Sequence, residues 1–228
     1  MSGIGDSQPV RSNQTGIHEN LEETVERHIA NPWLRPIAEH TREQFLNADV
    51  FVRKLAAPVI LDSCCGTGDS SRQLAERFPA HTVIGFDKSS SRLGRERDHA
   101  DHSNMLLIRA DMNDLYRLIL EKDWNVERHY MFYPNPWPKA SHLKRRVHGS
   151  PLFPSLCKLG GIFEMRSNWL IYLQEFQEAL NIAQYSASIT EIEPTIPVSP
   201  FERKYAASGH KLYQLTSSLN HASTKVII

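Results

Sequence analysis

VILDSCCGTG, residues 59–68, is the stretch of the chain that decides its fold. It begins with a short apolar run, preceded by a proline and rich in β-branched residues, which is typical of a buried central strand. Small residues follow as far as Ser71, and Leu74 and Phe78 then recur four residues apart, as on one face of a helix. The pattern predicts a strand, a tight glycine turn and a helix, with backbone N–H groups pointing out of the turn.

A second apolar run, residues 82–86, ends in Asp87 about twenty residues after the turn. An acidic side chain at the end of a second strand is placed to hydrogen-bond a ribose diol. In the turn itself, Asp62 precedes Gly66 and Gly68, whose missing side chains allow a ligand to approach closely. The Asp62 carboxylate would repel a pyrophosphate but suits an amino-acid or sulfonium group. The pattern therefore favours S-adenosylmethionine (SAM) over a dinucleotide.

The rest of the chain alternates strand and helix patterns. Helices are expected from Leu21 onward and over 36–52, 89–91 onward, 113–122 and 169–182; strands are expected over 105–108, 130–133, 161–165, 188–192 and 211–216. This alternation predicts an α/β fold with a doubly wound sheet and ligands at the carboxyl ends of its strands. Asp111, just past the third strand, could accept a hydrogen bond from an adenine amino group, with Met112 packing on the ring. The alternative is that Asp111 only caps the helix beginning near Asn113.

Composition and length limit the number of domains and the class of protein. The chain has 228 residues, 26 Lys and Arg against 26 Asp and Glu, and 40% hydrophobic residues, as expected of one sizeable α/β domain. Residues 1–16, rich in Gly, Ser, Asn and Gln, are expected to form a flexible arm, and residues 17–228 a single domain. No apolar run approaches the roughly 20 residues that span a bilayer, and no secretion segment is visible, so a cytoplasmic protein is expected. Three cysteines cannot build a disulfide framework, and buried thiols are expected.

Charge is segregated between residues 128 and 163, where no Asp or Glu occurs. The same span carries three histidines and the cations Lys139, Lys144, Arg145, Arg146 and Lys158. A one-signed patch beside a cofactor pocket indicates a polyanionic substrate, and a solvated basic helix face is the alternative. Within the proline-stiffened loop 135–139, Trp137 is expected to plug the core rather than to offer a stacking surface.

Several motifs together resemble one family, the bacterial tRNA (guanine-N7)-methyltransferases. They are QTGIHENLEE, VILDSCCGTG, VIGFDKS, NPWPKASHLKRR, SNWLIYLQEF and SPFERKYAASGH. The resemblance implies a SAM-dependent, Rossmann-like methyltransferase with an antiparallel strand near the C-terminus, tRNA as partner, and no metal or membrane; monomer and homodimer both stay open. The cofactor residues then expected are Asp62, Gly66, Gly68, Asp87, Lys88, Asp111 and Met112. The substrate residues expected are Lys139, His142, Arg145, Arg146, Ser199, Phe201, Glu202 and Arg203.

The chain departs from the family pattern at the reacting end of the site. The family usually has Asp where this chain has Asn135 and Asn168, so the resemblance places these two amides at the catalytic positions. Ser199-Pro200 replaces Thr-Lys, and Cys64 stands where the family generally has Gly. An amide can hydrogen-bond a base edge but cannot supply the negative charge that stabilises a methylated, cationic guanine. The resemblance, which covers nearly the whole chain, still implies methylation of guanine N7 in tRNA. The alternatives are an RNA-binding paralogue without turnover and a SAM methyltransferase that acts on another substrate.

Overall fold

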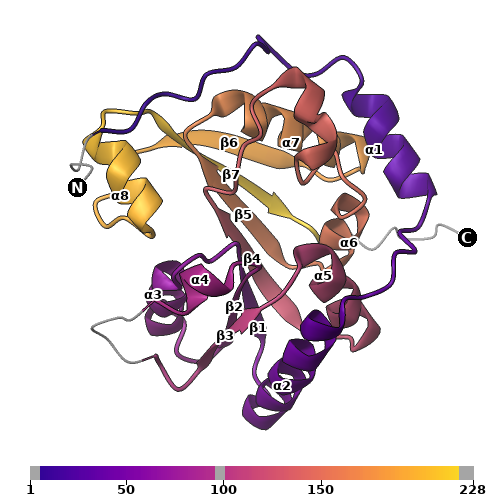
Figure 1. Ribbon diagram of the computed structural model, residues 1–228, viewed down its shortest axis with the longest axis vertical. Coiled ribbons are helices and arrows are strands. Elements are labelled where there is room, and N and C mark those ends of the chain that lie inside the picture. The colour runs from indigo at the N-terminus through magenta and orange to yellow at the C-terminus, as the bar shows by residue number, and fades with distance from the viewer. Residues whose placement is uncertain (1–5, 96–100, 221–228) are drawn as a thin grey trace, which may run out of the picture.

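The computed structural model describes residues 6–95 and 101–220, in which one seven-stranded sheet has the order β3-β2-β1-β4-β5-β7-β6 (Figure 1). Strands β1 to β5 run parallel, and β7 lies antiparallel between β5 and β6. The strands are β1 (Val59–Ser63), β2 (Thr82–Asp87), β3 (Met105–Arg109), β4 (Val126–Phe132), β5 (Ile162–Ser167), β6 (Ala187–Ile192) and β7 (Leu212–Ser218). The sheet confirms the predicted doubly wound α/β fold with an antiparallel strand, β7, near the C-terminus.

Helices cover both faces of the sheet and bury two apolar clusters. One cluster lies under α1 (Leu21–Ala30), α2 (Glu39–Leu55), α5 (Met112–Glu121), α6 (Phe153–Lys158) and α7 (Leu170–Ile182). The other lies under α3 (Asp69–Arg77) and α8 (Pro200–Ala207), on the side where Figure 1 also shows α4 (Ser90–Leu93). All five residues of β1 are buried because β2 and β4 flank it and helices cover it on both sides. Strand order reverses at β1, and a crevice is expected there at the carboxyl ends.

Three short elements were not expected from the sequence: the 3-10 turn η1 (Ala140–Arg145), α6 and α8. The first two are too short to show an amphipathic period. For α8 a local signal exists, because the Ser199 side chain accepts a hydrogen bond from the Glu202 backbone N–H, as in a capping box.

The N-terminal segment, expected to be a flexible arm, contacts the rest of the domain over the residues that the structure describes. Residues 6–16 run from beside α8 to α1 across the top of the molecule in Figure 1. The backbone N–H of Ser7 donates to Ser208 Oγ, the Ser12 hydroxyl donates to the Pro138 carbonyl, and Asn13 Oδ1 accepts from the Ala140 N–H. Residues 1–5 of the expected arm lie outside the described part. Within residues 6–95 and 101–220, no helix has the length and apolar character that a membrane crossing requires.

Candidate active site

A cavity of about 670 Å³ lies at the carboxyl ends of the parallel strands. One wall comes from the ends of β1, β2 and β3, and a second from the loop after β4, residues 133–137. The other walls come from residues 144–152 with Tyr172, from α8, and from Trp33. The cavity therefore joins the end where a cofactor was expected to the end where a substrate was expected.

Asp87 organises the cofactor end. Its Oδ2 accepts a hydrogen bond from the Gly66 N–H at 3.1 Å. Its Oδ1 accepts from the Ser89 N–H at 2.8 Å and lies 3.1 Å from the Arg92 guanidinium. The carboxylate lines the cavity while tying the turn after β1 to the end of β2. A ribose diol bound here would share an acceptor that the protein already holds in place.

The turn after β1 has two left-handed glycines with different roles. A Cβ added at Gly66 (φ +60°) would meet no atom within 4 Å, so this position faces open space. A Cβ added at Gly68 (φ +82°) would lie 2.6 Å from Leu107 Cδ1, so Gly68 allows the turn to pack on β3. Cys64 also adopts a left-handed backbone (φ +63°), which is uncommon for a residue with a Cβ, and it lines the cavity. Burial raises the pKa of its thiol to about 12, so the thiol stays protonated at neutral pH.

The structure places Asp62 behind the turn rather than in the cavity. The carboxyl group is fully buried, and its Oδ2 accepts hydrogen bonds from the Ser70 and Ser71 hydroxyls, each at 2.6 Å. Its Oδ1 has no hydrogen-bond partner among the described residues. Burial raises the pKa of Asp62 to about 6, although the two serine hydroxyls oppose that shift. A buried acceptor is left open directly beneath the turn.

Asp111 caps α5 and also lies in the wall of the cavity. Its Oδ1 accepts from the Asn113 N–H at 2.9 Å and so caps α5. It also lines the cavity, together with Met112, Asn113 and Lys88. The cap uses Oδ1, which leaves Oδ2 for a ligand. The Asp111 N–H donates to Thr41 Oγ1 of α2 at 3.1 Å, which fixes the end of β3 against that helix.

The loop after β4 presents Asn135 to the cavity. Asn135 Oδ1 accepts from the Trp137 N–H at 3.3 Å, an Asx turn that leaves the side-chain NH₂ free of this bond. Trp137 is half-buried and lines the cavity, and the Arg145 guanidinium lies 4.8 Å from its ring centroid. The expectation that Trp137 plugs the core is therefore wrong, because the turn of the loop (Trp137 φ +47°) directs the indole toward the cavity.

The consecutive cations 144–146 point to different places. Lys144 and Arg145 are exposed and line the cavity, and Lys139 is exposed just outside it. Arg146 is fully buried: its guanidinium pairs with Glu175 and donates to the carbonyls of Trp137 and Lys139 and to Gln14 Oε1. The expectation that Arg146 contacts substrate is corrected by this geometry, since every side of the group is occupied by protein.

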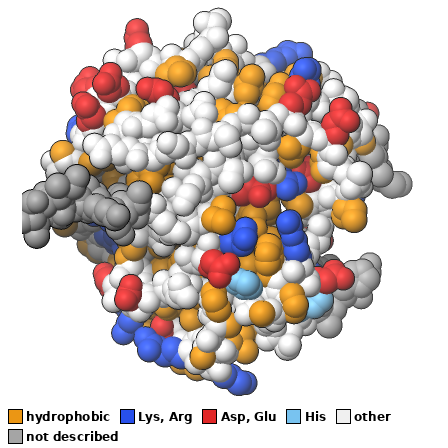
Figure 2. All heavy atoms as spheres, turned by 180° about the vertical axis from the view of Figure 1, so that it is seen from behind, with side chains coloured by type: hydrophobic (Ala, Val, Ile, Leu, Met, Phe, Trp, Pro, Cys, Tyr) orange, Lys and Arg blue, Asp and Glu red, His pale blue; other side chains and the backbone are white. Residues whose placement is uncertain are grey.

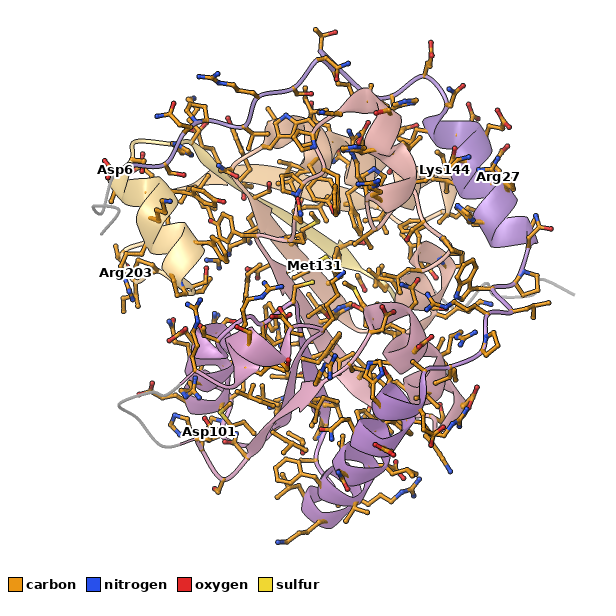
Figure 3. All side chains as sticks on the ribbon, viewed as in Figure 1. Asp6, Arg27, Asp101, Met131, Lys144 and Arg203 are labelled. Carbon is orange, nitrogen blue, oxygen red and sulfur yellow. The ribbon has the colours of Figure 1, made fainter. Side chains whose placement is uncertain are left out.

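Two of the four residues expected to contact substrate near the C-terminus are held in contacts within the protein. Ser199 caps α8, and Glu202 is fully buried, accepting from the Tyr133 hydroxyl at 2.8 Å, the Val198 N–H at 2.7 Å and the Arg166 guanidinium at 3.1 Å. Phe201 is 47% exposed and lines the cavity. Arg203 lies on the outer side of α8, away from Met131 at the centre of the molecule (Figure 3).

Sorted by position, the expected residues fall into two groups. Those lining the cavity are Asp87, Lys88, Asp111, Met112, Asn135, Arg145 and Phe201. Those outside its lining are Asp62, Gly66, Gly68, Lys139, His142, Arg146, Asn168, Ser199, Glu202 and Arg203. Asn168 instead has its Nδ2 3.0 Å from His210 Nδ1. Lining residues that the sequence analysis missed include Tyr133, Tyr205 and Trp33, and only Tyr133, at the end of a predicted strand, carried a signal.

Within the described residues, no group of three or more His, Cys, Asp or Glu side chains is arranged to hold a metal ion. The three cysteines are free thiols, two of them buried. The back of the molecule, seen in Figure 2, carries both acidic and basic side chains with apolar ones between them.

Comparison with known proteins gives one family and many relatives. Residues 56–215 match the family model described as "Putative methyltransferase". The chain is 25% identical over 198 residues to the tRNA (guanine-N(7)-)-methyltransferase of Photorhabdus laumondii, covering 82% of each chain. It is 29% identical over 173 residues to that of Shewanella oneidensis, covering 72% of this chain and 71% of the relative.

Solved structures share the fold at low identity. The 16S rRNA methyltransferase KamB matches with a TM-score of 0.55 and 15% identity, covering 82% of this chain and 95% of that one. A variant of the 16S rRNA (adenine(1408)-N(1))-methyltransferase from Catenulisporales acidiphilia, determined with its cosubstrate SAM, matches with a TM-score of 0.54 and 14% identity. That match covers 75% of this chain and 90% of the other.

Proposed function

Since the chain belongs to the methyltransferase family whose model it matches over residues 56–215, we propose that it transfers a methyl group from SAM to guanine N7 of tRNA. The observation that carries the proposal is the cavity itself. It runs from the acids at the ends of β2 and β3 to an amide-bearing loop and an aromatic helix face, with exposed cations at its side. The names of the relatives from Photorhabdus laumondii and Shewanella oneidensis supply the substrate, tRNA guanine N7.

The residues of the cofactor end fit SAM. Asp87 would bind the ribose hydroxyls, and Asp111 Oδ2 would accept from the adenine amino group, with Met112 against the ring. The open space at Gly66 admits the cofactor to the turn, and the unpartnered Asp62 Oδ1 beneath it suits the neighbourhood of a bound ammonium group. When bound, the cofactor would supply a methyl group on a sulfonium, and its sulfur would leave as the neutral thioether of S-adenosylhomocysteine.

The residues of the other end suit a nucleotide. Lys139, Lys144 and Arg145 are exposed cations that would contact phosphates. Asn135 would hydrogen-bond the edge of a base, and Phe201 and Tyr205, whose rings stack with centroids 6.2 Å apart, would contact its face. Guanine must leave its stack to reach such a cavity, as bases do in other enzymes that act on them.

Chemistry at guanine N7 needs alignment rather than a base. The N7 lone pair lies in the ring plane and carries no proton, so the protein has to align it with the methyl group and exclude water. The positive charge that develops on the methylated guanine is stabilised less here than it would be by carboxylates at these positions. Asn135 is neutral, and the Glu202 carboxylate is already paired with Arg166 and the Tyr133 hydroxyl. We expect methyl transfer that is slower, by up to roughly tenfold, than with a carboxylate at position 135.

Single-turnover transfer from methyl-labelled SAM to bulk tRNA tests the proposal. We expect label in tRNA with the wild-type chain, loss of most transfer in Asp87→Ala, and a faster rate in Asn135→Asp. Wild-type chain that binds SAM, seen as a rise in melting temperature, but transfers no label would contradict it.

One observation favours the second candidate, an RNA-binding paralogue without turnover. Glu202, the only glutamate of α8, forms a buried ion pair with Arg166, so no carboxylate from α8 faces the cavity. The same assay separates the two functions, because the paralogue would bind tRNA with salt-sensitive affinity and transfer nothing.

A further inference from the structure

The segment between α1 and α2, residues 31–38, is pinned to α5. Arg117 Nη1 donates to the Trp33 carbonyl at 3.0 Å and to the Arg35 carbonyl at 2.8 Å. Asp114 Oδ2 accepts from the Ala38 N–H at 2.9 Å, and the same carboxylate pairs with Arg117 at 3.4 Å. Figure 1 shows this segment descending past α5 on its way to α2. The backbone of Trp33 is thus fixed relative to the helix that begins at the cavity.

The Trp33 side chain stands at the cavity wall and is only partly covered by the protein. Residue 33 is 37% exposed, whereas Trp124 and Trp169, which lie in the core, are 8% and 7% exposed. It lines the cavity together with Asp111, Met112 and Asn113, the residues at the start of α5. A large aromatic ring held open on a fixed backbone gains by covering its face with another flat apolar group.

We propose that Trp33 is one wall of the subsite for the purine ring of the nucleoside cofactor, with Met112 contributing from α5. The inference rests on the proposed function, because it needs SAM in this cavity. The cofactor purine is favoured over the substrate base for a geometric reason. Arg117 and Asp114 attach the Trp33 segment to α5, which follows β3, whereas Asn135 and its loop follow β4. Asp111, the acceptor suited to the purine amino group, caps that same helix.

Titration calorimetry with S-adenosylhomocysteine on the full chain tests the assignment. Removing one stacking partner typically weakens nucleobase binding about tenfold or more, so Trp33→Ala should raise the dissociation constant by about that factor. Trp33→Phe, which keeps an aromatic face, should recover most of the affinity. The matched control is Leu34→Ala, whose side chain is the 84% exposed neighbour of Trp33 and is absent from the cavity lining; it should bind as the wild type does.

A second readout does not depend on how well Trp33→Ala folds. In a Trp137→Phe background, S-adenosylhomocysteine should quench the fluorescence of Trp33, because Trp124 and Trp169 are buried away from the cavity. Adding Trp33→Phe should abolish the quenching while the ligand still binds. Unchanged quenching, or Trp33→Ala binding within twofold of the wild type, would overturn the assignment.

The outcomes also separate this inference from the proposed function. A wild-type chain that binds no S-adenosylhomocysteine contradicts both. A wild-type chain that binds it with no contribution from Trp33 contradicts only the assignment of the purine wall. Loss of tRNA affinity in Trp33→Ala, with unchanged cofactor affinity, would place the indole against the substrate and overturn the assignment in a third way.

Discussion

At the scale of single residues, the buried carboxyl group of Asp62 makes the stability of the fold depend on pH. Its pKa is about 6 in the folded chain because burial disfavours the ionised form, against an ordinary value of 3.8. The folded state therefore holds a proton that the unfolded state has lost between these two pH values. The free energy of unfolding that Asp62 contributes consequently falls as pH rises from about 4 to 6, and stays lower above that range.

The variant Asp62→Asn should lose this pH dependence. Between pH 4.5 and pH 8, the unfolding free energy of the wild-type chain should fall by roughly 2 kcal/mol more than that of the variant. The size follows because one pKa unit corresponds to about 1.4 kcal/mol. Urea unfolding at both pH values measures it, and contributions of other groups, such as His129, whose pKa burial lowers to about 3, cancel in the comparison. An identical pH dependence in both proteins would contradict the account of Asp62.

The adjacent Arg145 and Arg146 show what a charge pattern can and cannot predict. The acid-free stretch indicated a basic surface, and Lys139, Lys144 and Arg145 are exposed there. Nothing local distinguishes Arg146, whose direction is set by Glu175 of a helix that is distant in sequence. The position of Asp62 behind the turn was not predictable for a related reason, because the serines of α3 hold its carboxyl group there.

Changing each of these two arginines to glutamine should therefore affect a different property, stability for Arg146 and tRNA binding for Arg145. Arg146→Gln removes the permanent opposite charge from buried Glu175 and should cost about 3–5 kcal/mol of unfolding free energy. Arg145→Gln should leave stability unchanged and lower the slope of log tRNA affinity against log salt by about 1. Chemical unfolding and filter binding at several salt concentrations measure the two effects. Equal stability of the two variants would contradict the buried role of Arg146.

At the scale of elements, the N-terminal segment and the loop after β4 form one unit with α7. Gln14 Nε2 donates to Glu175 Oε1 and to the Gly16 carbonyl, and Glu175 Oε1 also accepts from the His18 N–H at 3.0 Å. Burial alone would raise the pKa of Glu175, but its contacts with His148 and Arg146 lower that pKa to about 2. Because burial lowers the pKa of His148 itself, the Arg146 guanidinium is the permanent positive charge beside Glu175. Arg146 also donates to the carbonyls of Trp137 and Lys139, so the loop that carries Asn135 is attached to α7 through this ion pair.

Gln14→Ala tests whether that support reaches the site. The change removes one acceptor from Arg146 and two bonds of the N-terminal segment, so we expect a loss of about 1–2 kcal/mol of unfolding free energy. Methyl transfer to tRNA should slow while the affinity for S-adenosylhomocysteine stays unchanged, because Gln14 does not line the cavity. Gln8→Ala, in the same segment, is the control. A variant with wild-type transfer would show that the segment does not support the loop.

Helices and strands with a regular pattern of apolar residues were predictable from the sequence, and elements without such a pattern were not. The parallel strands of the sheet showed as apolar runs, and α1, α5 and α7 as amphipathic stretches, to within a few residues of their bounds. The docking of residues 6–16 depends on polar side chains that meet only in the folded chain, and composition alone suggested a flexible arm. The cavity wall from Trp33 depends likewise on Arg117, more than eighty residues away.

At the scale of the whole molecule, the chain has equal numbers of acidic and basic residues and yet places cations beside one cavity. The sheet order puts β1 at the point where the strand order reverses, and this determines where that cavity lies. The fold and the location of the site followed from the alternation of strands and helices and from the acids at the strand ends. The lining of the site did not, since α8, η1 and Trp33 reach it through tertiary packing.

Identification of the methylated nucleoside tests the central claim most directly. Bulk tRNA lacking N7-methylguanosine is incubated with the full chain and methyl-labelled SAM, digested to nucleosides and analysed by mass spectrometry, with Asp87→Ala as the control. We expect label in N7-methylguanosine with the wild-type chain, and little or none with the control. Label in any other nucleoside, or no labelled nucleoside from a chain that binds SAM, would contradict it.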